Sequence, residues 1–172
     1  SSTQEKSNEL AGSLGLGGGE TLLIAGSTHS GEEEILISAF KDLRKTDPQL
    51  ILLLAPRHLD RLEEVEKLLR KESITWERRT SFSSRTKEKA AGEVILLDTM
   101  GELMSLYRLG TIVFIGGSLV PVGGHNPLEP LFFRKPVLFG PHMFHFSEIA
   151  QQLTEAKGAI QVKGREELFL HL

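Results

Sequence analysis

Polar side chains able to bind an anion gather in five short segments of this chain, and each segment directly follows an apolar run. The segments read GSTHSGEEE, APRHLDR, DTMGEL, GGSLVPVGGHNPLEP and GPHMFHF. An arginine such as Arg57 presents a planar fork of N–H donors that fits a phosphate or a carboxylate. A carboxylate such as Glu129 can accept both hydroxyls of one ribose. This concentration of polar residues indicates a ligand site.

The first segment places Gly26, Ser27 and Thr28 directly before an expected helix. Free N–H groups and the helix dipole favour an anion at such a position. A structural alternative uses the same segment: Ser30 caps the helix, and Glu33 three residues later completes a capping box. We expect the cap, which is compatible with anion binding. The segment matches neither the GxGxxG pattern nor the P-loop pattern.

The glycine-rich segment lies between two apolar runs. Its glycines stand at 116–117, where a buried strand is expected to end, and at 123–124, before a helix expected to begin near Asn126 and Pro127. Glycine lets the main chain come close to a ligand. The alternative is a loop that needs positive φ angles, with Glu129 complementing the helix dipole. Four glycines around one strand end favour the ligand interpretation.

Arginine and histidine residues follow two other apolar runs. For Arg57, after the stiff Pro56, we favour contact with phosphate or carboxylate over an ion pair with the following Glu-rich helix. For His58, an ordinary position at a helix start is an equally good interpretation. His142 and His145 lie three residues apart, but no HExxH or carboxylate-rich segment supplies further metal ligands. We therefore expect packing or ligand contact there, and no metal site.

The DTMGEL segment has two interpretations. Asp98 or Thr99 could cap the helix that carries Leu103. A backbone group near Met100 and Gly101 could instead pair with the edge of a base. Spacing alone does not decide between the two, and the cap is the default.

Seven apolar runs are expected as strands, over residues 21–27, 50–56, 74–78, 94–98, 111–117, 136–140 and 158–162. Most are continuously apolar, which is typical of strands covered on both faces. Helical spacing between them, as in Leu36, Phe40 and Leu43, predicts an α/β fold with a Rossmann-like parallel sheet and helices on both faces. Ligands bind beyond the carboxyl ends of such strands. The five polar segments all fall there.

The composition limits the class of protein. The 172 residues, 40% of them hydrophobic, suffice for one domain or one half of a larger protein. The net charge of −3 offers no basic surface for nucleic acid, and the absence of cysteine excludes disulfides. No apolar run is long enough to span a bilayer. We expect residues 1–20 to be a flexible leader or linker, residues 21–172 to be the domain, and residues 78–93 to be a mobile loop.

Five motifs together resemble the carboxyl-terminal half of bacterial 3-deoxy-D-manno-octulosonic acid (Kdo) transferases: AGSTHSGEEEILISAF, APRH, LLDTMGELMSLY, FIGGSLVPVGGHNPLEP and PVLFGPHMFHFSEI. The resemblance runs from about Thr21 to the end of the chain. It implies one half of a GT-B glycosyltransferase, which has two facing Rossmann-like domains. This half would bind the cytidine monophosphate part of the donor, CMP-Kdo. The family transfers Kdo to a lipid A precursor at the cytoplasmic face of the inner membrane, with inversion and without a cofactor or essential metal.

The resemblance also implies roles at the phosphate end of the donor. Ser27 and Thr28, with nearby amides, would meet the phosphate. Arg57 would pair with the phosphate or the Kdo carboxylate, with His58 beside it. Asn126 would contact phosphate or sugar.

At the nucleoside end, the resemblance implies that Met100, Gly101 and Glu102 frame the cytosine. Glu129 would hold the ribose hydroxyls. The resemblance thus implies a cytosine-binding role for the DTMGEL segment, which its spacing alone does not indicate.

Gly117 and Ser118 would line the floor of the cleft. The catalytic base, a Glu of the amino-terminal half, and the membrane attachment would both lie outside this chain. We therefore expect the chain alone to be soluble and inactive as a transferase. Two alternatives remain: the donor half of a GT-B enzyme that handles a UDP-sugar, and a nucleotide-binding domain without catalysis.

Overall fold

The structure, a computed structural model, describes residues 2–84 and 93–172. Its strands are β1 (Thr21–Thr28), β2 (Leu50–Pro56), β3 (Trp76–Arg78), β4 (Val94–Leu96), β5 (Ile112–Ile115), β6 (Val137–Phe139) and β7 (Ala159–Gln161). Its α-helices are α1 (Ser2–Ser13), α2 (Glu32–Leu43), α3 (Leu62–Lys71), α4 (Leu103–Leu106), α5 (Leu128–Phe132), α6 (Ser147–Glu155) and α7 (Arg165–His171). Three short 3₁₀ helices are η1 (Leu59–Arg61), η2 (Arg79–Ser84) and η3 (Tyr107–Leu109). Within the described ranges, no helix has the length and apolar character needed to cross a membrane.

All seven strands form one parallel sheet in the order β3-β4-β2-β1-β5-β6-β7. The seven expected strands are all present, and β3, β4, β5, β6 and β7 are shorter than the expected runs at one or both ends. The chain extends the sheet from β1 first through β2 and later through β5. The crevice between β1 and β5 is therefore the switch point, the position at which such sheets bind ligands.

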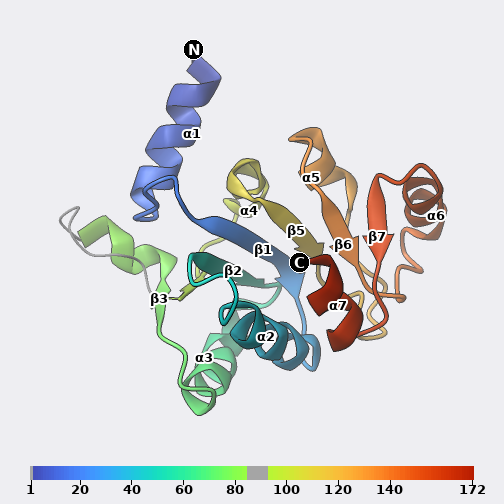
Figure 1. The fold of residues 1–172 in the computed structure, drawn as a ribbon, viewed down its shortest axis with the longest axis horizontal. Coiled ribbons are helices and arrows are strands. Elements are labelled where there is room, and N and C mark those ends of the chain that lie inside the picture. Colours follow the sequence, from blue (N-terminus) through green and yellow to red (C-terminus); the bar gives the residue numbers. More distant parts are fainter. Residues whose placement is uncertain (1, 85–92) are drawn as a thin grey trace.

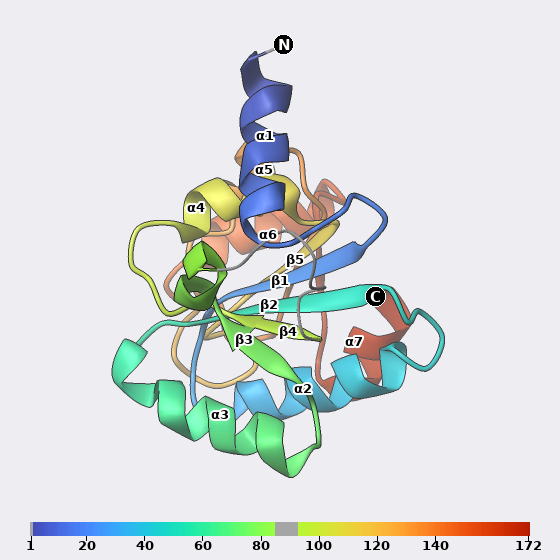
Figure 2. The same cartoon turned by 90° about the vertical axis from the view of Figure 1, so that its left-hand side faces the viewer.

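The side chains of β1 alternate between two cores. Leu23 and Ala25 join the core built with α2, α3 and α7, whereas Leu22 and Ile24 join the core built with η3 and α6. Figures 1 and 2 show α2, α3 and α7 on one face of the sheet and α1, α4, α5 and α6 on the other. Burial on both faces explains why the strand sequences are continuously apolar.

The first twenty residues differ from the predicted flexible leader. Residues Ser2–Ser13 form α1, and Leu14 directly after it is completely buried in the second core. The guanidinium of Arg79 donates to the carbonyl and the hydroxyl oxygen of Ser13, both at 3.2 Å. Leu14 and Ser13 provide these contacts, so a sequence that is otherwise polar and glycine-rich gives little indication of them.

The predicted mobile loop over 78–93 lies partly outside the described residues, which exclude 85–92. Within the described part, Arg78 ends β3 and residues Arg79–Ser84 form η2. The low apolar content of this segment does not prevent order, because polar contacts support it and Phe82 packs against the second core. For example, Thr80 donates its backbone N–H to Asp98 at 3.0 Å.

Candidate functional site

The turns after β1, β2 and β4 meet at the carboxyl edge of the sheet around an open pocket of about 200 Å³. The residues that line it are Ser27, Ala55, Pro56, Arg57, Leu97, Thr99, Met100, Gly101 and Leu103. Four of these are predicted from the sequence: Ser27, Arg57, Met100 and Gly101. Complete ligand sites usually measure roughly 300–1,000 Å³. The pocket therefore accommodates only part of a ligand.

Arg57 is exposed at this pocket, and its side chain has no hydrogen-bond or ion-pair partner among the described residues. Its backbone N–H donates to the Thr28 carbonyl at 2.9 Å, which ties the turn after β2 to the end of β1. The alternative ion pair with the following helix is made by Arg61 instead. Arg61 donates to Glu33 at 2.8 and 2.9 Å and pairs with Glu64 at 3.1 Å. Arg57 thus remains available for a phosphate or carboxylate.

Thr28 and Ser118 have no solvent-exposed surface. The Thr28 hydroxyl donates to Glu33 at 2.9 Å. The Ser118 hydroxyl donates to the Ile115 carbonyl at 2.5 Å and accepts the Gly140 N–H at 2.8 Å. Both side chains therefore support the turns in this structure. The contacts predicted for them, with a phosphate and with the cleft, would need surface that they do not expose.

The glycine-rich loop after β5 requires glycine for its own conformation. Gly117, Gly123 and Gly124 have φ angles of 68°, 114° and 79°, which residues with a Cβ rarely adopt. A Cβ on Gly116 would collide with the backbone of Ser27. The groups that come close to these glycines belong to the protein itself. The loop conformation itself therefore requires these glycines, so the glycines alone do not indicate a ligand.

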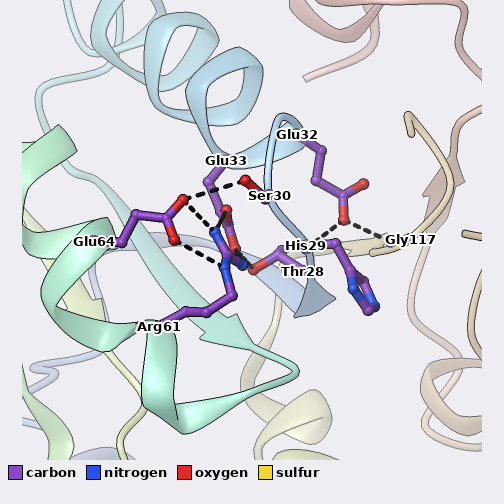
Figure 3. A network of polar contacts seen from close by, with 8 residues as sticks. All are labelled: Thr28, His29, Ser30, Glu32, Glu33, Arg61, Glu64 and Gly117. Atoms are coloured by element: carbon purple, nitrogen blue, oxygen red, sulfur yellow. Dashed lines mark hydrogen bonds and ion pairs between the residues drawn. The ribbon is translucent and has the colours of Figure 1, made fainter. Parts of the chain in front are cut away.

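Two adjacent carboxylates at the start of α2, Glu32 and Glu33, are completely buried, and neither is predicted as a site residue. The predicted capping box is not formed, because α2 begins after Gly31 without a side-chain cap. Ser30 donates to Glu64 at 3.2 Å instead. Figure 3 shows Glu33 within this network and Glu32 directed away from it. A run of three glutamates at a helix start is also common on exposed helices, so the sequence does not reveal their burial.

Glu32 lies against the turn after β1 and the loop after β5. Its Oε2 accepts the backbone N–H of His29 at 2.8 Å and of Gly117 at 2.5 Å. Its Oε1 accepts the backbone N–H of Leu119 at 3.3 Å and of Ser118 at 3.4 Å. Burial raises the pKa of Glu32, and the four N–H groups oppose that shift.

Three imidazoles form a cluster at the same edge. The Nε2 atoms of His29 and His125 are 2.9 Å apart, and His58 contacts His29 edge-on with ring centroids 5.6 Å apart. Burial lowers the pKa of His29 to about 4, helped by nearby positive charges, and burial also lowers the pKa of His125. Both rings are therefore neutral at pH 7, and one Nε2 donates to the other. His58 is a predicted site residue, whereas His29 and His125 are missed although their segments are singled out.

The turn after β4 presents Met100 and Gly101 to solvent. Met100 is 70% exposed, and Gly101 has a φ angle of 86° and open space around it. The Glu102 carboxylate accepts the Thr99 hydroxyl and a guanidinium N–H from η2. The following helix α4 has no side-chain cap, so the predicted cap by Asp98 or Thr99 is wrong. The turn is thus held by other contacts, and its tip is free.

Asn126 and Glu129 lie on the β5 side of the switch point and do not line the pocket of about 200 Å³. The Asn126 Oδ1 accepts the Leu128 N–H at 3.0 Å, where α5 begins. Glu129 lies in the first turn of this helix and is half-buried. Burial raises the pKa of Tyr107, and the charge of Glu129 adds to the shift. A ligand that reaches both Met100 and Glu129 would therefore cross the end of β1.

In the part of the chain that the structure describes, no group of three or more histidine and carboxylate side chains could hold a metal ion. His145 donates its backbone N–H to Gly123 at 3.0 Å, and its ring lies 4.8 Å from the ring of Phe144. His142 donates its backbone N–H to the Ser118 carbonyl at 2.9 Å. These contacts fix the turn after β6 against the glycine-rich loop.

A larger hollow of about 590 Å³ lies between the C-terminal end of α2 and α7. Its charges neutralise each other, because Lys45 and Arg165 both pair with Asp42. It also lies away from the carboxyl ends of the strands. The smaller pocket, with its unpaired arginine, is the better candidate for a ligand site.

The chain folds as a Rossmann-like domain of the nucleotide-binding class. This class is defined here by the parallel sheet with its switch point at β1 and by the edge pocket, which has an apolar wall and a free arginine. No protein-family model matches the chain. The chain is 48% identical over 139 residues to the 3-deoxy-D-manno-octulosonic acid transferase of Haemophilus influenzae, which covers 81% of this chain and 32% of that protein. It is 38% identical over 150 residues to the transferase of the same name from Aquifex aeolicus, covering 87% and 40%.

The fold is also similar to a crystal structure described as the C-terminal CMP-Kdo binding domain of WaaA from Acinetobacter baumannii. The TM-score is 0.85 at 28% sequence identity, over 95% of this chain and 83% of that one. The chain is thus related to the Kdo transferases and corresponds to their C-terminal domain, which confirms the resemblance and the predicted fold class. It spans about a third of the length of the curated relatives that it matches.

Proposed function

We propose that this chain is the donor-binding domain of a Kdo transferase and that it binds the CMP part of CMP-Kdo. The observation that carries the proposal is the pocket in which three distant turns place an unpaired arginine beside an apolar wall. Similarity to a domain described as CMP-Kdo binding supports the same ligand. The volume of about 200 Å³ suits one part of a nucleotide sugar.

The cytosine packs against the turn after β4 in this proposal. Met100 supplies an exposed, polarizable side chain, and the open backbone at Gly101 can pair with the edge of the base. Glu102 holds this turn through Thr99. The ribose hydroxyls lie near Glu129, across the end of β1.

Arg57 binds the donor phosphate or the Kdo carboxylate, with Ser27 and His58 close to it. The amide nitrogen of Asn126 is a further donor, because its Oδ1 is used by the helix start. In the whole enzyme, the acceptor hydroxyl oxygen attacks the anomeric carbon of Kdo, and a base outside this chain accepts its proton. The bond from that carbon to the phosphate oxygen breaks, and its electron pair leaves with CMP. Arg57 stabilises the growing negative charge, a contribution typically worth about 10²–10³ in rate.

We further propose that the whole enzyme is a GT-B, inverting transferase and that the acceptor is a lipid A precursor at the cytoplasmic face of the inner membrane. Acceptor binding and membrane contact fall to segments outside this chain. The domain described here contributes binding energy that holds the anomeric carbon in place. This binding energy comes from contacts with the nucleotide, so the affinity for CMP can be measured on the chain itself.

Isothermal titration of the chain with CMP and with UMP tests the proposal. A related domain has been crystallised as a C-terminal domain, so the chain is a suitable sample. We expect CMP to bind more tightly than UMP, because the turn after β4 reads the edge of the base. A preference for UMP would favour an enzyme of uridine-linked sugars, and failure of CMP to bind even the whole enzyme would contradict the proposal.

Substitution of Arg57 tests the phosphate contact. Arg57→Ala removes a charge-assisted hydrogen bond, which is typically worth about 1.5–3 kcal/mol, so the Kd for CMP should rise roughly 10–100-fold. The matched control is Lys71→Ala, which removes a positive charge at the far end of α3 and should leave the Kd unchanged. Equal effects of the two substitutions would show that Arg57 acts only through net charge.

A further inference from the structure

The hydrogen-bond ladder between β1 and β5 ends where the donor site begins. Its last pair is Gly26 with Ile115, followed by the Gly116 N–H that donates to the Gly26 carbonyl at 2.7 Å. Beyond this point the two strands continue into separate turns. Something other than the sheet must fix these turns relative to each other.

Glu32 joins the two turns through hydrogen bonds to both of them. Both of its carboxylate oxygens are buried, and they accept one N–H from the turn after β1, at His29, and three from the loop after β5, at residues 117–119. Burying a carboxylate is costly unless hydrogen bonds compensate for the lost hydration. Four converging N–H groups provide that compensation, so the two turns are bound together through one charge (Figure 3).

A concave group of backbone N–H donors next to a positive φ angle forms a nest that normally binds an external anion. Here Gly117, with a φ angle of 68°, provides such a nest, and the Glu32 carboxylate fills it. A donor phosphate therefore cannot use these amides without displacing Glu32. Of the amides near Thr28 that the sequence-based expectation places at the phosphate, the His29 N–H is therefore occupied by Glu32, whereas the side chain of Arg57 remains available.

Both joined turns carry polar side chains of the site. Ser27 lies at the end of β1 and His29 in the turn after it, and the loop after β5 leads to His125 and Asn126. The His29 and His125 rings meet at 2.9 Å between their Nε2 atoms, so a small shift of one turn would break this contact. We propose that Glu32 is a positioning residue, an internal anion that fills the nest at the ends of β1 and β5 and fixes the two turns that carry the donor site.

Glu33 provides a matched comparison. It is adjacent and equally buried, but it forms an ion pair with Arg61 and accepts the Thr28 hydroxyl, both on the opposite side of the turn. Glu32→Gln and Glu33→Gln therefore both remove a buried carboxylate, and only the first affects the loop after β5. Glu64→Gln, at the exposed end of the same network, is the control that should change neither loop.

Hydrogen exchange of residues 116–119 tests the positioning role without any ligand. We expect at least about tenfold faster exchange in this segment for Glu32→Gln, because the N–H groups lose a charged acceptor, and no such change for Glu33→Gln or Glu64→Gln. If Glu32→Gln does not fold, Glu32→Asp keeps the charge but shortens the reach, and it should show the same faster exchange. Wild-type exchange of residues 116–119 in a folded variant would overturn the proposal.

Titration with CMP supplies the second measurement, which rests on the proposed function. At equal fractions of folded protein, we expect the Kd for CMP to rise about tenfold in Glu32→Gln and less than about twofold in Glu33→Gln. Equal losses in both variants would assign Glu32 a merely structural role and overturn the proposal. If neither the wild-type chain nor the whole enzyme binds CMP, the proposed function fails, and hydrogen exchange alone decides whether Glu32 holds the two turns.

Discussion

At the residue scale, the imidazole pair His29 and His125 links the two sides of the switch point. Each ring is partly buried, and burial lowers the pKa of both, that of His29 to about 4. A proton on either ring would place a positive charge next to Arg57, which faces the same cluster. The neutral pair therefore leaves Arg57 as the principal positive charge at the pocket.

This pKa shift predicts a pH dependence of stability. The unfolded chain protonates His29 below its ordinary pKa of 6.5, whereas the folded chain does so only near pH 4. The stability that neutral His29 contributes is therefore complete above about pH 6.5 and is lost as the pH falls towards about 4. Urea unfolding across this window should show a shallower loss of unfolding free energy for His29→Gln than for wild type. The exposed His171→Gln is the control, and identical slopes for His29→Gln and wild type would contradict the prediction.

At the element scale, α1 and η2 extend the domain beyond the seven strands and their crossover helices. Arg79 of η2 binds both Ser13, at the end of α1, and Glu102, in the turn that carries Met100. The first helix is therefore connected, through one guanidinium, to the turn proposed to hold the cytosine. Leu14 anchors the same region in the core.

Leu14→Ala tests whether this region is part of the folded domain. Large-to-small substitutions in a core cost about 2–5 kcal/mol, through lost burial and the remaining cavity. We expect a loss of this size in the unfolding free energy, measured by urea denaturation. Leu170→Ala is the matched control, because Leu170 is 77% exposed, and it should change the free energy by less than about 0.5 kcal/mol. A similarly small effect of Leu14→Ala would support the flexible leader.

At the scale of the whole molecule, the parallel sheet brings turns from distant parts of the chain to one edge. The resulting pocket of about 200 Å³ is open to solvent. Exposed apolar side chains stand on the turns at this edge, among them Met100 after β4, Val122 after β5 and Phe144 after β6. Such a surface suits one wall of a cleft, in agreement with a GT-B arrangement in which a second domain supplies the other wall.

The proposed function therefore predicts that the chain alone retains nucleotide binding and lacks transferase activity. We expect it to bind CMP and to transfer no detectable Kdo from CMP-Kdo to a lipid A precursor, because the proposed base lies elsewhere. The measurement is a transfer assay beside the titration, with the whole enzyme as the positive control. Detectable transfer by the chain alone would contradict this division of roles.

Much of the architecture was predictable from local sequence. Continuous apolar runs marked most of the strands because residues buried on both faces cannot alternate with polar ones, whereas the edge strands β3 and β7 are partly exposed and more polar. The edge pocket was predictable in part: Ser27 lies at the end of its strand, and Arg57, Met100 and Gly101 lie in the turns that follow theirs. The burial of the Thr28 and Ser118 hydroxyls against α2 and the turn after β6 was not predictable. Such burial depends on packing between segments far apart in the chain.

The sequence by itself determined the fold class and the family, because hydrophobic periodicity and short motifs are local properties of the chain. Only the tertiary structure decided which charges are free and which are used internally. Arg57 and Arg61 differ by four positions, yet one is unpaired and the other is bound by Glu33. In the sequence, Glu32 is one of three glutamates at a helix start. Its special role becomes visible only in the structure, where the loop after β5, 85 residues further on, places its amides around the carboxylate. Long-range hydrogen bonds of this kind leave no periodic pattern, so three-dimensional contact is needed to reveal them.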